Sequence, residues 1–102
     1  MEYLFTYGTL QDTQVQEYIF GRVLEGQNDY VLGFKILENA VYGKYALAQQ
    51  TQNIKDEVPG VVYEVTFSEL KKADVYETSA YRREKFPLRS GKQAWIYIEN
   101  SN

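Results

Sequence analysis

The first residues of the chain alternate as the residues of a half-buried β-strand do. Aromatic side chains occupy every second position of EYLFTY, residues 2–7, and this period of two predicts a strand. The pattern stops abruptly at Gly8 and Thr9, and no charged residue follows before Asp12. Such a stretch is typical of a plain strand exit, and it also fits a strand whose C-terminal end is shaped to hold a ligand.

A helical period replaces the strand period after this turn. Apolar residues at positions 15, 18 and 19 fall at helical spacing, and Gly21 then marks a stop. The pattern predicts a helix over residues 13–20, in which Thr13 and Gln16 resemble a capping box.

Apolar runs separated by turn-forming residues predict the remaining strands. Gln52–Val58 is polar and is expected to be an exposed loop, and Pro59-Gly60 marks the entry to the strand that follows. About five to seven short strands and two helices, without regular strand–helix alternation, predict one small α+β domain over residues 1–102. Its sheet is expected to be bent, mostly antiparallel and barrel-like. The strands after the first are expected over residues 29–37, 45–50, 61–65, 81–88 and 92–98, the last two joined by a turn at 89–92.

A second helix is predicted over Glu69–Glu77, with Ser68 as its N-cap. At about 100° of rotation per residue, Ala73 lies about 60° from the direction of Leu70, and Glu77 lies about 20° from it. Glu77 therefore projects from the apolar side of the helix, where leucine or alanine is usual. Partial burial raises the pKa of a carboxyl above its reference of about 4.3, which suits a base that must later return its proton.

Glu77 also has a plainer interpretation, which helical geometry alone favours. Helices fray near their ends, so its carboxylate could simply reach solvent or pair with Arg82 or Arg83. Asp74 lies about 40° from Leu70, nearer the edge of the apolar stripe, and is interpreted as exposed or structural.

Composition narrows the chemistry that the chain can perform. Its 102 residues include no histidine and no cysteine, which excludes thiolate nucleophiles, disulfides, serine–histidine arrangements and the commonest zinc ligand. Proton transfer would therefore fall to a carboxylate, a lysine or a tyrosine. The ten tyrosines, five phenylalanines and one tryptophan are expected mostly as half-buried sheet residues.

Charge and hydropathy limit the expected partners. The formal net charge is −3 without a basic block, which argues against nucleic acid. Binding of a single strand through tyrosines and residues 82–85 would need a positive groove. No apolar run approaches the ~20 residues of a membrane helix, and no secretory signal is visible. We expect a cytoplasmic protein with neither a membrane nor a nucleic-acid partner, and its oligomeric state stays open.

Three features together carry a resemblance to a known family: the strand ending in YGTL, the helix ending in YE, and Tyr81-Arg82 beyond it. The chain resembles the gamma-glutamylcyclotransferase-like family, which includes the gamma-glutamylamine cyclotransferases and the plant avirulence-induced-gene proteins. This resemblance implies a small mixed domain built on a bent, barrel-like sheet. It covers nearly the whole chain in four ordered segments: LFTYGTL (Leu4–Leu10), PGVVYEV (Pro59–Val65), ADVYETSAYRR (Ala73–Arg83) and AWIYI (Ala94–Ile98).

The resemblance implies a reaction and a site. The reaction is an intramolecular aminolysis, in which the α-amine of a γ-glutamyl-amine or γ-glutamyl-amino acid attacks the γ-carbonyl and releases 5-oxoproline and an amine. No cofactor or metal is implied, because nucleophile and electrophile belong to one small molecule. Glu77 would be the catalytic acid/base. The residues implied to bind the substrate are Tyr7, Gly8, Thr9, Leu10 and Tyr81.

Several positions depart from the family pattern. Many members have glycine after the catalytic glutamate, where this chain has Thr78, and basic or glycine-rich residues after the tetrapeptide, where it has Gln11 and Asp12. These differences favour a second hypothesis, a non-catalytic binding or regulatory module that uses the same cavity for a small carboxylate ligand. Tyr81 could also pack as a lid on the core, and Gln50–Val58 is the segment that could cover a site.

Overall fold

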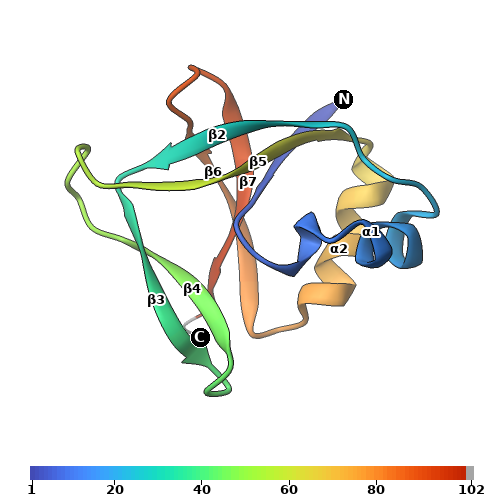
Figure 1. The fold of residues 1–102 in the computed structure, drawn as a ribbon, viewed down its shortest axis with the longest axis horizontal. Coiled ribbons are helices and arrows are strands. Elements are labelled where there is room, and N and C mark those ends of the chain that lie inside the picture. Colours follow the sequence, from blue (N-terminus) through green and yellow to red (C-terminus); the bar gives the residue numbers. More distant parts are fainter. Residues whose placement is uncertain (101–102) are drawn as a thin grey trace.

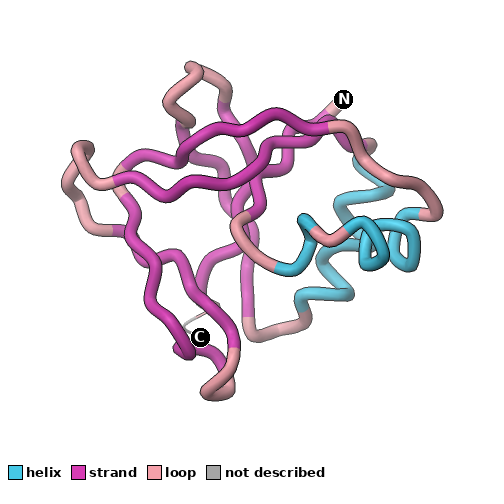
Figure 2. Tube along the Cα trace, viewed as in Figure 1, coloured by secondary structure: helices cyan, strands magenta, loops and turns pink. Residues whose placement is uncertain are grey.

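The computed structural model describes residues 1–100, so the last two residues of the domain predicted over 1–102 lie outside the described residues. Two sheets and two α-helices form the fold (Figures 1 and 2). The predicted α+β class, with two helices and a bent, mostly antiparallel sheet, is confirmed. The elements are β1 (Glu2–Thr6), a 3-10 helix (Thr9–Gln11), α1 (Thr13–Phe20), β2 (Gly26–Leu32), β3 (Phe34–Val41), β4 (Tyr45–Gln50), β5 (Glu57–Val65), α2 (Phe67–Glu77), β6 (Tyr81–Pro87) and β7 (Gln93–Glu99).

The main sheet has five strands in the order β2-β5-β1-β7-β6. Its pairs are antiparallel except β1 with β7, which run parallel where Leu4 faces Trp95. The two edges approach each other: Val31 of β2 forms a bridge with Leu88, and Arg89 N donates to Tyr30 O at 2.8 Å. This contact between edge strands makes the sheet barrel-like.

The second sheet is the β3–β4 hairpin, which Figure 1 shows on the side of the main sheet opposite the helices. The single strand predicted over 29–37 is wrong, because Gly33 divides it into β2 and β3. Gly33 has φ +80, a left-handed conformation that few other residues adopt without strain. Its N–H donates to Asp56 O and its carbonyl accepts from Thr51 N, so the break is fixed by hydrogen bonds.

Strand β5 is longer than predicted. It begins at Glu57 instead of Val61 and continues through Pro59 and Gly60. Within β5, only Val61–Val65 pairs with β1. At Pro59, β5 therefore has a single partner, Tyr30 of β2. Proline is tolerated because it lacks an N–H donor where one side of the strand has no ladder to maintain.

Helix α1 has the predicted bounds but a different cap. Asp12, in place of the predicted Thr13, is the N-cap, and its side chain accepts from Gln14 N at 2.8 Å. Gln16 is buried instead of capping the helix: it donates to Leu10 O at 2.8 Å and accepts from Leu24 N at 2.9 Å. The predicted capping box is therefore wrong, because Gln16 faces inward and supports the chain on both sides of the helix.

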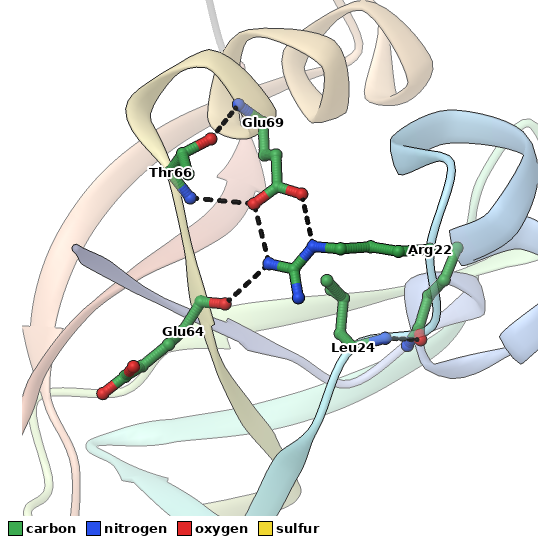
Figure 3. A network of polar contacts seen from close by, with 6 residues as sticks. Arg22, Leu24, Glu64, Thr66 and Glu69 are labelled. Atoms are coloured by element: carbon green, nitrogen blue, oxygen red, sulfur yellow. Dashed lines mark hydrogen bonds and ion pairs between the residues drawn. The ribbon is translucent and has the colours of Figure 1, made fainter.

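Helix α2 begins at Phe67, two residues before the predicted start. Its N-cap is Thr66 in place of Ser68, and Thr66 forms a complete capping box with Glu69. Figure 3 shows that the Glu69 carboxylate also receives two hydrogen bonds from Arg22, at 2.8 and 2.9 Å. This network ties the start of α2 to the segment that follows α1.

Two buried clusters form the core, one on each face of the main sheet. One lies between that sheet and the β3–β4 hairpin and includes Phe5, Phe34 and Ile96. The other lies beneath the helices and includes Leu4, Leu70 and the side chains that meet them. Within residues 1–100, neither helix has the length and apolar character to span a membrane.

Candidate active site

A cavity of about 370 Å³ opens where β1 ends, α2 ends and the β3–β4 hairpin turns. Five of the six residues predicted for the site line it, whereas Leu10 does not. Leu10 is 2% exposed, and its side chain packs in the cluster beneath the helices. The lining residues are Phe5, Thr6, Tyr7, Gly8, Thr9, Val41, Tyr42, Tyr45, Ala46, Tyr76, Glu77, Thr78, Tyr81 and Tyr97.

Glu77 is the last residue of α2 and points into this cavity. Leu70 and Ala73, which share its side of the helix, are completely buried. Burial raises the pKa of the Glu77 carboxyl to about 7, because a charged carboxylate loses hydration there. Among residues 1–100, no side chain forms a hydrogen bond or ion pair with it. The carboxyl can therefore change its protonation state near neutral pH.

The arginines that could have paired with Glu77 have other partners. Arg83 binds Asp74 through two hydrogen bonds, at 2.8 and 2.9 Å. Arg82 pairs with Glu84 of its own strand. The plainer interpretation of Glu77 as an ion-paired helix end is thus contradicted.

Asp74 has a structural role, as the sequence indicated. Besides Arg83, its carboxylate accepts a hydrogen bond of 2.6 Å from the Tyr97 hydroxyl, and these bonds lower its pKa. The Arg83 guanidinium also lies over the Trp95 ring, 4.4 Å from its centroid. These contacts join the last turn of α2 to β6 and β7 and so fix the helix end that carries Glu77.

The chain leaving β1 presents backbone N–H groups beside the cavity. Gly8 N donates to Thr6 Oγ1 at 3.3 Å, and the Thr9 hydroxyl shares a 2.8 Å hydrogen bond with the Tyr76 hydroxyl. Within residues 1–100, the N–H groups of Thr9 and Leu10 reach no protein acceptor. Thr9 lines the cavity, so its N–H group is available to a ligand there, whereas Leu10 lies next to the lining residues in the chain.

The backbone of Gly8 does not lie in the left-handed region. Its φ is −127, which other residues also adopt. A Cβ built on Gly8 would meet nothing within 4 Å. The protein itself therefore leaves open space at this residue, which is where a ligand could approach the backbone closely.

Tyr7 and Tyr81 connect the cavity wall to neighbouring strands. The Tyr7 hydroxyl donates to Tyr97 O at 2.8 Å, and the Tyr81 hydroxyl donates to Ala46 O at 3.4 Å. Burial raises the pKa of both phenols, so both remain protonated donors at neutral pH. Tyr81 is half-buried, and it both lines the cavity and packs against the core cluster beneath the helices.

Sequence reasoning missed the contribution of the β3–β4 hairpin. Tyr42, Tyr45 and Ala46 line the cavity, whereas none of Gln50–Val58, the segment expected to cover a site, does so. Tyr76 was also missed. The hairpin residues carry no local signal, because the fold of the hairpin toward α2 depends on contacts distant in sequence.

A metal site would need a cluster of suitable ligands. Residues 1–100 contain no group of three or more acidic, histidine or cysteine side chains placed to hold a metal ion. Glu77 stands apart from the other carboxylates, which are engaged in the ion pairs described above or lie outside the cavity.

The model of the family described as "Gamma-glutamyl cyclotransferase, AIG2-like" matches residues 4–102. No curated protein sequence matches the chain significantly. The resemblance inferred from the four sequence segments is confirmed by the family match.

Six chains of solved structures match this fold significantly, among them the following three. One, from Arabidopsis thaliana, has TM-score 0.79 and 23% identity, covering 99% of this chain and 71% of its own. An uncharacterized protein from Pyrococcus horikoshii has TM-score 0.74 and 19% identity, covering 100% and 80%. A third, titled "Gamma-glutamyl cyclotransferase", has TM-score 0.71 and 21% identity, covering 96% and 66%. These identities establish a common fold and leave the substrate open.

Proposed function

Because the chain belongs to the AIG2-like gamma-glutamyl cyclotransferase family, we propose that it converts a γ-glutamyl-amine or γ-glutamyl-amino acid into 5-oxoproline and a free amine. One observation carries the proposal: Glu77 lies in a cavity, has no protein partner among residues 1–100, and has a pKa raised to about 7. A base with a pKa near the working pH can both take and return a proton.

The proposed reaction needs one proton carrier. The Glu77 carboxylate takes a proton from the substrate's α-ammonium, and the neutral amine then attacks the γ-carbonyl, closing a five-membered ring. The carbonyl electron pair moves to oxygen and returns as the bond to the leaving nitrogen breaks. Glu77 gives its proton to that nitrogen, then takes the extra proton from the ring nitrogen and passes it to the leaving amine, which departs as an ammonium ion.

The oxyanion of the tetrahedral intermediate needs donors that are already in position. The N–H groups of Thr9 and Leu10, which reach no acceptor among residues 1–100, support this role. Leu10 would then contribute through its backbone while its side chain anchors the loop in the core. The Thr9 hydroxyl, held by Tyr76, supplies a further polar contact to the glutamyl group.

A panel of γ-glutamyl compounds tests the proposal. We expect the purified protein to release 5-oxoproline from at least one compound, and Glu77→Gln to lower kcat by about a thousandfold or more, because glutamine cannot carry the proton. Release is measured by chromatography. The matched control is Glu17→Gln, which removes an exposed carboxylate from α1 and should leave activity unchanged.

The same experiment separates the alternative. A non-catalytic module would bind a glutamyl-like carboxylic acid in calorimetry and release no 5-oxoproline from any compound. Full activity in the Glu77→Gln variant, with both variants folded by circular dichroism, would contradict the assignment of Glu77 as the base.

A further inference from the structure

The cavity has an unusual lining. Among the described residues that form it, six are tyrosines and Glu77 alone carries a charge. Four of the tyrosines have hydroxyls bonded to the protein: Tyr7, Tyr81, Tyr97 and Tyr76, the last through the Thr9 hydroxyl. The cavity thus offers a ligand aromatic faces, hydroxyls and backbone N–H groups.

Three of the six tyrosines form a rim at the opening. This tyrosine rim consists of Tyr42 and Tyr45 from the β3–β4 hairpin and Tyr76 from α2, with exposed fractions of 76%, 46% and 36%. Large aromatic side chains left this exposed contribute little to the core. Because the rim residues come from separate elements and meet around one opening, they form a surface that another aromatic group can contact.

Three cations, Arg82, Arg83 and Lys44, lie within two residues of a cavity-lining residue in the sequence. Arg82 and Arg83 pair with Glu84 and Asp74. Lys44, at the turn of the β3–β4 hairpin, lies with Nζ 6.0 Å from the centroid of the Tyr45 ring and does not line the cavity. A carboxylate on the leaving group would therefore lie in a cavity whose one charge is negative when Glu77 is ionised.

We propose that the tyrosine rim binds the leaving group and selects an aromatic amine that carries no carboxylate. The substrate class would be γ-glutamyl-arylalkylamines in preference to γ-glutamyl-amino acids, an inference that rests on the proposed function. A second carboxylate loses hydration without gaining a cation and is repelled by Glu77. An aromatic ring gains edge or stacked contacts with the rim tyrosines.

Two matched pairs of compounds test this. γ-Glutamyl-phenethylamine and γ-glutamyl-phenylalanine differ by one carboxylate, and we expect kcat/KM to be about tenfold or more higher for the first. γ-Glutamyl-phenethylamine and γ-glutamyl-ethylamine differ by the ring, and the ring should raise kcat/KM about three- to tenfold. Equal values within either pair, or the reverse order, would overturn the inference.

Variants locate the selectivity. The double variant Tyr42→Ala, Tyr45→Ala should lose the advantage of the ring. Tyr18→Ala, which removes a tyrosine that is 87% exposed on α1 and outside the cavity, should keep it. The inference would be overturned if the unaltered protein preferred the carboxylated compound and the Lys44→Gln variant did not. Lys44 would then be the partner of the carboxylate.

Binding separates failure of this inference from failure of the proposed function. In calorimetry, the Glu77→Gln variant should still bind γ-glutamyl-phenethylamine more tightly than γ-glutamyl-phenylalanine. The ratio of the two affinities should be smaller than in the unaltered protein, because the repelling charge is gone. Such a preference without 5-oxoproline release by the unaltered protein would support the rim and refute the turnover. If the variant bound neither compound, the proposed role of the tyrosine rim would be refuted.

Discussion

The carboxyl of Glu77 is held where its charged form is least stable. Its pKa is raised by burial from 4.5 to about 7, so the folded protein binds this proton more tightly than the unfolded chain does. Stability is therefore lost as pH rises from about 4.5 to about 7, and it is level above that range. Burial of this carboxyl thus costs the fold free energy at neutral pH.

This linkage predicts an effect of Glu77→Gln on stability. Glutamine does not titrate, so the variant should match the unaltered protein near pH 4.5 and be more stable at pH 8, by roughly 1 to 3 kcal/mol. Thermal unfolding at both pH values measures the difference, and each kcal/mol corresponds to about 4–8 °C for a domain of this size.

Glu17→Gln is again the control, since Glu17 is exposed on α1. It should behave alike at both pH values. An equal stability difference at pH 4.5 and pH 8 for Glu77→Gln would contradict the raised pKa.

At the scale of elements, α2 is fixed at both ends. Asp74 holds its last turn against Arg83 and Tyr97, and Glu69 holds its first turn against Thr66 and Arg22 (Figure 3). Since Glu77 is the final residue of this helix, its position in the cavity depends on both anchors.

The first anchor can be weakened selectively by Glu69→Gln. Glutamine keeps the capping box with Thr66 but loses the ion pair with Arg22, and we expect a loss of about 1–3 kcal/mol in the free energy of unfolding at pH 7. The Arg22 guanidinium lowers the pKa of Glu69 to about 2. The stabilisation is therefore present above about pH 4.5 and is lost as pH falls toward 2.

Denaturant unfolding at pH 7 and pH 3 measures this difference. Glu25→Gln, which removes an exposed carboxylate from the segment before β2, serves as the control and should change stability little. A loss for Glu69→Gln that is as large at pH 3 as at pH 7 would show that the ion pair is not its source.

The hydrophobic pattern predicted the helices and strands well where residues close in sequence determine the structure. The periods of β1 and α1 gave their bounds almost to the residue. Pro59 and Gly33 led to opposite errors: β5 was predicted too short, and β2 and β3 were predicted as one strand. The proline is tolerated within β5 because that part of the strand has no neighbour on one side. The glycine separates β2 from β3 through its dihedral angles. Neither fact is contained in the local sequence.

The candidate site shows the same division. The inward direction of Glu77 followed from helical geometry. Tyr42 and Tyr45 could not be found, because they reach the cavity only through the fold of the β3–β4 hairpin toward α2. The site forms where the end of β1, the end of α2 and the β3–β4 hairpin meet. The sequence indicated the first two of these elements.

The whole-molecule arrangement depends on the turn at Gly33, which directs the β3–β4 hairpin. Gly33→Ala should cost about 1–2 kcal/mol, because an L-residue is strained at positive φ. Gly8→Ala is the matched control: Gly8 has negative φ and open space around it, so its stability should be nearly unchanged. Thermal unfolding compares the two, and equal losses would contradict this account of the hairpin.

The parallel contact between β1 and β7 has a consequence for how the chain is made. Leu4 and Trp95 meet at the centre of the main sheet, so a nascent polypeptide extending only to α2 leaves one edge of β1 without its neighbour. Long-range closure of this kind delays the native topology until β7 has been synthesised. During translation, that uncovered edge can pair with a wrong strand, and a chaperone that covers it would prevent such misassembly.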